Sequence, residues 1–276
     1  MSVLCCYLIF FTSLYSVLAQ DAGVEDLLLV LGGGGEPSVA LFNQACDRQC
    51  VVDIPDIPQA YGSPGRTGSY AAILGDTVLV CGGLDDAGPP ISSFKDCQGL
   101  NLNTLSWTAS QMGNYSANGV SVQISPDQFT IFGGENTRYD GPSPTEWVDH
   151  NQIQHLDTTG DTGAEWVFLD QLTLNNDSFL GSCAVVHDDK VWMTDGVGGS
   201  TLLSFSLTTQ EWEVVFPDLG FSAKRHGCVV AKVNGEDNMI FLGGDNDLVG
   251  SYRSGINIIL GLVWSISSWV RWGSMS

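Results

Sequence analysis

Short apolar runs that end in a glycine pair recur along the chain. The runs are LLLVLGG, VLVCGG, TIFGG and MIFLGG, and a variant, VWMTDG, has aspartate in the first glycine place. Their last glycines are Gly33, Gly83, Gly134, Gly196 and Gly244, so the intervals are 50, 51, 62 and 48 residues. Runs of this length bounded by turn residues indicate β-strands. The glycines assigned to the repeat are Gly32, Gly33, Gly82, Gly83, Gly133, Gly134, Gly196, Gly243 and Gly244.

Other sequence features recur at the same interval as the glycine pairs. A second apolar run precedes each of the last four, as in GSYAAIL and HGCVVAKV, and a polar turn separates the two runs. A third apolar stretch and a tryptophan follow in LNLNTLSW, FSLTTQEW and the looser HLDTTGDTGAEW. No segment has sustained helical periodicity with caps, so each unit predicts four short strands. The repeat tryptophans are Trp107, Trp166 and Trp212.

A strand that ends in Gly-Gly and is followed by a tryptophan, repeated about every 50 residues, resembles the kelch repeat. The resemblance covers residues from about 25 to about 250. It implies an all-β fold: a kelch-type β-propeller of about five recognisable four-stranded blades. Kelch propellers usually have six or seven blades, so an incomplete or truncated ring stays open as an interpretation. Leu100 and Phe205 stand where the family usually has tyrosine, and Arg66, Arg225 and His226 stand where it often has basic residues.

The physics of a blade explains the glycine pair. One four-stranded sheet cannot bury both faces alone and must stack on neighbours. Glycine permits positive φ and close backbone approach where the chain leaves the strand. The GGGG at 32–35 is therefore assigned to a blade, because no helix and no Lys-Ser/Thr follow it as they would in a phosphate-binding loop.

The first 19 residues have the pattern of a signal peptide. An apolar stretch precedes Val17 and Ala19, which occupy the −3 and −1 places of a cleavage site. The start lacks Lys and Arg, and an uncleaved membrane anchor is the alternative. We expect residues 1–19 to be removed, residues 24–250 to form the propeller, and the product to be secreted and extracellular.

Export makes disulfides and glycans relevant. The strand alignment predicts a bridge between Cys81 and Cys97 in one unit, and a second local bridge between Cys46 and Cys50. Cys183 and Cys228 are interpreted as holding the same place in successive units, and either bridge across two blades or stay as buried thiols. Two sequons, at Asn114 and Asn176, are glycosylation candidates.

Charge limits the partners. Ten Lys and Arg face 31 Asp and Glu, for a net charge of −21. Such a surface repels phosphate backbones, which argues against nucleic-acid binding and favours a soluble monomer.

The tail at 251–276 departs from the repeat and is interpreted as a partial last blade or a truncation product. Its apolar part, 255–270, is shorter than the ~20 residues of a spanning helix, so a membrane-anchored ectodomain is the minor alternative.

The chain shows no convergent catalytic motif. The kelch resemblance includes exported copper-radical oxidases, which need two His, two Tyr and a Cys beside one Tyr. The four histidines, at 150, 155, 187 and 226, lack metal-ligand spacing. We therefore expect no cofactor, no metal and no enzymatic activity, with the oxidase as the alternative function.

A binding role is the favoured interpretation, because recognition concentrates on loops of a rigid scaffold. The longest irregular stretch is 135–165, and it accounts for the 62-residue interval. Tyr139 and Trp147 lie in it as candidate anchors for an extracellular protein or glycan. A decorative insert is the alternative interpretation of this stretch.

Overall fold

The structure of the protein is a computed structural model. The structure describes residues 15–19, 27–33, 36–43, 56–58, 66–85, 92–138, 146–149, 152–159, 165–169, 179–196, 199–219, 226–233, 236–242, 262–265 and 268–271. All regular secondary structure in these ranges is β, and they include no helix. Accordingly, no helix long and apolar enough to cross a bilayer occurs among them.

Three complete four-stranded antiparallel sheets form the middle of the fold. We name them the second, third and fourth blades. The second contains β4 (Tyr70–Leu74), β5 (Thr77–Cys81), β8 (Asp96–Asn101) and β9 (Ser106–Gln111). The third contains β10 (Val120–Ser125), β11 (Gln128–Phe132), β14 (Ile153–Asp157) and β15 (Glu165–Leu169). The fourth contains β16 (Ala184–His187), β17 (Lys190–Thr194), β18 (Leu202–Ser206) and β19 (Trp212–Phe216).

The two outer sheets are smaller. The first blade has β1 (Tyr15–Ala19), β2 (Leu27–Gly33) and β3 (Glu36–Asn43), with β1 antiparallel to β2. The last has β20 (Gly227–Val233) and β21 (Glu236–Leu242), and the hairpin of β22 (Leu262–Ser265) and β23 (Ser268–Arg271) lies against β21. β1 falls within the stretch assigned to a signal peptide, so removal of residues 1–19 would leave the first blade with β2 and β3. β22 and β23 fall within the tail.

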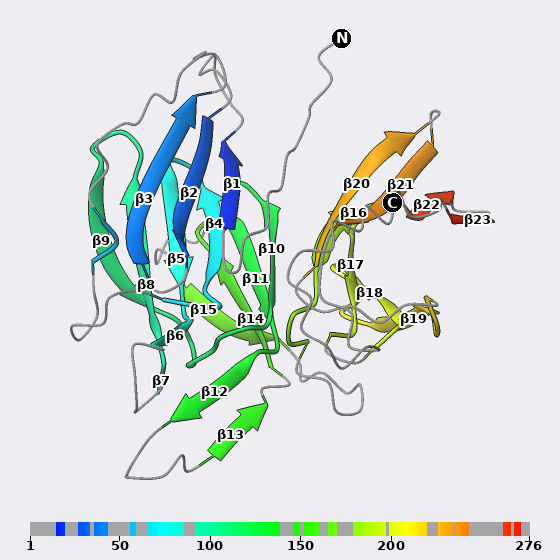
Figure 1. The fold of residues 1–276 in the computed structure, drawn as a ribbon. Coiled ribbons are helices and arrows are strands. Elements are labelled where there is room, and N and C mark those ends of the chain that lie inside the picture. The colour runs from blue at the N-terminus through cyan, green and yellow to red at the C-terminus, as the bar shows by residue number, and fades with distance from the viewer. Residues whose placement is uncertain are drawn as a thin grey trace, which may run out of the picture.

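The sheets follow one another as blades. Their first strands are neighbours in sequence order, because β1 contacts β4, β4 contacts β10, β10 contacts β16 and β16 contacts β20 (Figure 1). Where β4 meets β10, the side-chain amide of Gln123 donates to the Ile73 carbonyl and accepts the Ile73 N–H. The all-β architecture of stacked four-stranded blades is the one that the repeat predicts.

The apolar core lies between the blades in separate clusters. Trp166 packs with residues of the second and third blades, among them Tyr70 and Phe129. Trp212 packs with residues of the third and fourth blades and lies in a tilted ring contact with Phe205, 4.9 Å between centroids. Trp107 lies on the face of the second blade that points away from the third, beside Leu100 and Val78. Each repeat tryptophan therefore fills the face turned toward the preceding blade.

The glycine pairs have the conformation and the crowding that the repeat predicts. Gly83 and Gly134 have φ of 96° and 103°. A Cβ on Gly134 would lie 2.3 Å from the Ser116 Oγ and 2.5 Å from the Tyr70 hydroxyl oxygen. Gly196 also has positive φ, 90°, although Asp195 precedes it. Gly32 and Gly33 lie at the end of β2, and Gly243 and Gly244 lie outside the described residues.

Two disulfides lie among the described residues. Cys81 and Cys97 lie directly opposite each other on β5 and β8, with their Cα atoms 4.0 Å apart. Cys183 and Cys228 join the fourth blade to the last, with their Cα atoms 5.7 Å apart. Cys46 and Cys50 lie outside the described residues.

The inter-blade disulfide depends on a one-residue offset. The Cys183 carbonyl accepts the N–H of Thr194, the residue just before the Asp-Gly pair. Cys228 is opposite Phe241, which stands two residues before the glycine pair at 243–244. Thr194 stands only one residue before its Asp-Gly pair, so the two cysteines differ by one place. The interpretation that both cysteines hold the same place is therefore wrong. Alternate residues of a strand point to opposite faces, so the offset lets the two side chains meet between the sheets.

Candidate binding rim of the propeller

Two extra hairpins project from the same end of neighbouring blades. β6 (Leu84–Asp85) and β7 (Ser92–Ser93) lie between β5 and β8, and β12 (Glu135–Arg138) and β13 (Glu146–Asp149) lie between β11 and β14. Each begins directly after a glycine pair, and neither adds a strand to a blade. β7 contacts β12, and Figure 1 shows both hairpins below the sheets. We call this end, with both hairpins, the hairpin rim.

The hairpins are fastened to the blades by backbone bonds. Thr67 and Leu84 exchange N–H to carbonyl bonds of 3.1 and 2.7 Å, and Ala117 and Glu135 exchange bonds of 3.0 and 2.8 Å. The segment that enters each inner strand thus holds the first residue of a hairpin. Both hairpins start from fixed points on rigid blades, as a binding platform requires.

Glu135 ties the two hairpins together. Its carbonyl accepts a bond of 3.3 Å from the Ser93 hydroxyl of β7. Its carboxylate accepts a bond from the Asn118 side-chain amide. The residue is 8% exposed, so this carboxylate is held in a buried, hydrogen-bonded place. Sequence reasoning missed it, because a glutamate after Gly-Gly carries no signal of burial.

A chain of hydrogen bonds underlies the rim between the second and third blades. The Gly119 N–H donates to the Tyr70 hydroxyl at 3.0 Å, and the Ser116 hydroxyl donates to the Gly133 carbonyl at 3.0 Å. The Tyr70 and Ser116 oxygens are 2.7 Å apart. Since the serine proton is directed to Gly133, Tyr70 donates to Ser116. The chain couples one blade to the glycine pair of the next.

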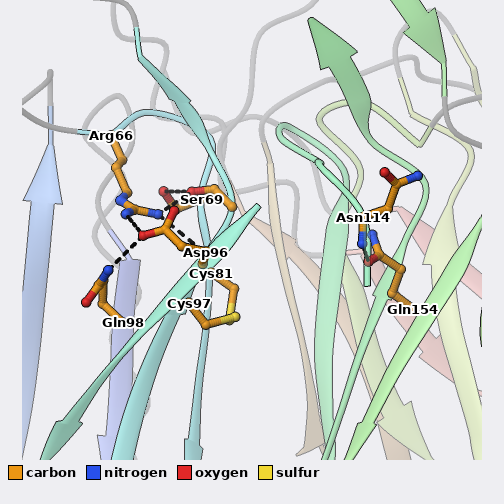
Figure 2. The surroundings of a disulfide bond; sticks show 9 residues. Arg66, Ser69, Cys81, Asp96, Cys97, Gln98, Asn114 and Gln154 are labelled. Atoms are coloured by element: carbon orange, nitrogen blue, oxygen red, sulfur yellow. Dashed lines mark hydrogen bonds and ion pairs between the residues drawn. A yellow bond between two sulfur atoms is a disulfide. The ribbon is translucent and has the colours of Figure 1, made fainter. Parts of the chain in front are cut away.

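Arg66 binds residues on both sides of the β6–β7 hairpin, at its base. Its guanidinium forms an ion pair with the Asp96 carboxylate and donates to the Gly82 carbonyl at 3.2 Å (Figure 2). Its guanidinium carbon lies 4.3 Å from the centroid of the Phe94 ring. Gln98 donates to the same carboxylate at 2.7 Å. The side chain of Arg66 is 6% exposed, so this basic residue positions the loop and is not a surface contact.

The hairpin segments are acidic. Residues 84–93 and 135–149 together contain six acidic residues against one arginine, a net charge of −5. Prolines and glycines make up three of the six residues at 86–91 and three of the seven at 139–145, in the links between the strands of each hairpin. The stretch from 135 to 165, which the sequence suggests is irregular, contains β12, β13 and β14 in its described parts. Trp147 lies on β13 opposite Thr137, and Tyr139 lies outside the described residues.

The three described histidines each have a different setting. The Nδ1 atom of His155 lies 2.8 Å from the Thr130 hydroxyl, and burial lowers the pKa of the imidazole although Asp157 opposes the shift. His187 lies 3.2 Å from the Asp188 carboxylate, and His226 is buried with its Nε2 atom 3.0 Å from the Thr194 hydroxyl. Within the described ranges, no cluster of three or more His, Cys, Asp or Glu is arranged to hold a metal.

Hydrogen bonds also lower the pKa of one carboxylate, that of Asp157. Asp157 accepts bonds from the Thr159 hydroxyl at 2.6 Å and the Gln128 amide at 2.9 Å. The Thr159 hydroxyl, followed by the Gln128 amide and the Thr159 N–H, lowers the pKa of Asp157 to about 2. This turn lies at the opposite end of β14 from the hairpin rim, since β14 follows β13 and ends at Asp157.

Of the two sequons, Asn114 is described and Asn176 is not. Asn114 is half-buried in the segment that leads from β9 to β10. Its backbone N–H donates to the Gln154 side chain at 2.8 Å, and its side-chain nitrogen donates to Gln152 at 3.1 Å.

Comparison with known proteins agrees with the fold. No protein-family model matches the chain, and no curated protein matches it in sequence. Among solved structures the chain is similar to the one titled "Structure of YjhT", a kelch-like β-propeller, with a TM-score of 0.62 and 15% identity. The match covers 85% of this chain and 73% of the other. At this identity the likeness establishes the fold alone: the chain is an all-β protein with the blade arrangement of a β-propeller.

Proposed function

We propose that the protein is an exported, non-catalytic β-propeller that binds an extracellular protein or glycan at the hairpin rim. The observation that carries this proposal is the pair of hairpins that pack on each other outside the blade sheets. An element that adds no strand to a blade is available for recognition.

The chemistry of the rim indicates the partner's surface. The acidic hairpin segments favour a partner with basic groups, because complementary charge speeds association and excludes like-charged partners. Trp147 and Tyr139 supply aromatic anchors in the same segment. Buried Arg66 and Glu135 hold the rim in shape and leave recognition to the projecting parts.

Export is supported by two features. The first 19 residues have the signal-peptide pattern, and two disulfides are formed among the described residues. Disulfides persist in oxidising compartments, so the pairs are consistent with an extracellular location.

The non-catalytic part of the proposal has a direct test against the copper-radical oxidase. The purified exported protein is assayed for copper content and for oxidation of primary alcohols in the presence of added copper. We expect no stoichiometric copper and no peroxide release. One copper per chain together with alcohol oxidation would establish the oxidase instead.

The binding part is tested with a photo-crosslinking amino acid at position 147, on β13. Asn103, exposed in the turn between β8 and β9 at the opposite rim, is the matched control position. The exported variants are irradiated in their native extracellular medium and the products are identified by mass spectrometry. A specific adduct at 147 and none at 103 supports the proposal, and an adduct formed equally at both positions contradicts it.

A further inference from the structure

An exposed aromatic surface surrounds the Asn114 sequon. Phe168 on β15 is 51% exposed, and Tyr115, next to Asn114, is 38% exposed. The Phe168 ring lies over Gly113, where an added Cβ would be 2.8 Å from the ring tip. Gln154, which accepts the Asn114 N–H, is opposite Phe168 in the β14–β15 register. Gln154 itself is buried beneath the rings, and we call the patch formed by Gly113, Asn114, Tyr115 and Phe168 the Asn114 surface.

The Asn114 amide has room for a substituent. Its Nδ2 atom donates to Gln152 Oε1, and its Oδ1 atom accepts the Tyr115 N–H at 2.9 Å. A primary amide carries two hydrogens, and bonds among the described residues use one of them. Figure 2 shows the Asn114 amide turned away from Gln154. A group attached to Nδ2 can therefore replace the second hydrogen while the bond to Gln152 stays.

We propose that Asn114 carries an N-linked oligosaccharide whose first sugars lie over Phe168 and Tyr115. The proposal rests on the proposed export of the chain. The C–H faces of a sugar pack on aromatic rings, which removes apolar area from water. The Gln152 amide and the Lys95 ammonium, 5.9 Å from the Tyr115 ring centroid, are donors for the sugar's hydroxyl and acetamido oxygens.

The transfer must precede folding of this region. In the folded protein the Ser116 hydroxyl of the sequon is fully buried and bonded to Tyr70 and Gly133, so an enzyme cannot recognise it there. The donor is a lipid-pyrophosphate-linked oligosaccharide of the secretory pathway. A bond forms between Asn114 Nδ2 and C1 of the first N-acetylglucosamine, the bond from C1 to the pyrophosphate oxygen breaks, and one amide proton leaves as the lipid pyrophosphate departs.

Occupancy is tested on the full chain exported from a eukaryotic secretory host. Peptide-N-glycosidase treatment in heavy-oxygen water converts each occupied asparagine to a labelled aspartate, which peptide mass spectrometry locates. We expect the label at Asn114 in wild type and in Asn176→Gln, and none at 114 in Asn114→Gln. An exported chain with Asn114 unoccupied overturns this inference but leaves the proposed binding function standing. A chain that is not exported overturns both.

The position of the glycan is tested by hydroxyl-radical footprinting before and after its enzymatic removal. We expect the labelling rate of Phe168 to rise roughly threefold on removal, because its ring returns to water. Asn114→Gln should show the same high rate without treatment. Val214 on β19, also 51% exposed, is the matched control and should not change. An occupied Asn114 with an unchanged Phe168 rate would overturn the proposed packing.

Discussion

The Tyr70 hydroxyl of the second blade donates to the Ser116 hydroxyl, 2.7 Å away, at the entry to the third blade. The serine in turn donates to the carbonyl of Gly133, in the next glycine pair. These two bonds connect the inner strand of the second blade to the glycine pair of the third blade. They also explain why residue 134 is a glycine, since a Cβ there would lie 2.3 Å from the Ser116 Oγ and 2.5 Å from the Tyr70 hydroxyl oxygen.

Tyr70→Phe should destabilise the protein by about 2 kcal/mol, because it leaves the Gly119 N–H without an acceptor and removes the bond that the Ser116 oxygen accepts. Urea denaturation followed by tryptophan fluorescence measures the change. Tyr115→Phe, at an exposed position, is the matched control and should change the midpoint little. Equal effects of the two substitutions would mean that the hydroxyl chain does not couple the blades.

Gly134→Ala and Gly75→Ala separate backbone conformation from crowding. Both glycines have positive φ, 103° and 54°, so each substitution strains the backbone by about 1 kcal/mol. A Cβ on Gly75 meets nothing within 4 Å, whereas one on Gly134 would meet Ser116, Tyr70 and the Ala117 carbonyl. Gly134→Ala should therefore lower the free energy of unfolding several-fold more than Gly75→Ala. Similar losses in the two variants would contradict the close approach at Gly134.

The two disulfides should stabilise different parts of the fold. The double variant Cys81→Ala/Cys97→Ala should lose about 3 kcal/mol, and Cys183→Ala/Cys228→Ala about 4 kcal/mol, because the second bridge closes a longer loop. Hydrogen exchange should speed up in β20 and β21 for the second variant and stay slow in β4 and β5. Non-reducing peptide mapping that finds Cys183 joined to a cysteine other than Cys228 would refute the register across that interface.

Stability should decrease as the pH falls from 7 to 5, partly through His155. Burial lowers its pKa in the folded state below 6.5, so the unfolded chain takes up the proton first. The stabilisation is complete above the unfolded pKa and is lost as the pH falls below it. His155→Gln should flatten the slope of unfolding free energy against pH in this window. Asp157, with a pKa of about 2 against a usual 3.8, adds a second loss only below about pH 4.

The sequence predicted the repeated elements well because their signals are local. The glycine pairs, the preceding strands and the tryptophans recur with nearly constant spacing, and Cys81 and Cys97 fall opposite each other in that scheme. The strand alignment also explains why Leu100 and Phe205 are buried in the places that the kelch resemblance assigns to tyrosine.

Other features lacked such a signal. β6 and β7 have two residues each, too few to show a period. Asn118 has a φ of 58° two residues before β10, and Gly68 has a φ of 63° two residues before β4. The two positions are equivalent, but one is glycine and the other asparagine, so the sequence alone does not show that they repeat. The inner strand β1 was not predicted, because its residues also have the pattern of a signal peptide. The Asn114 surface brings together segments about 50 residues apart, which no spacing reveals.

Shortening the β12–β13 hairpin tests the central claim, that the rim binds and the blades support it. Glu135 and Asp149 are opposite each other, so an Asn-Gly turn can replace residues 136–148 without disturbing the blade. The measurement is the affinity of this variant and of wild type for the molecule captured at position 147, alongside their urea midpoints. The account predicts a loss of affinity of roughly tenfold or more with an unchanged midpoint, because anchors at the centre of an interface dominate binding. Full affinity in the shortened protein would contradict it.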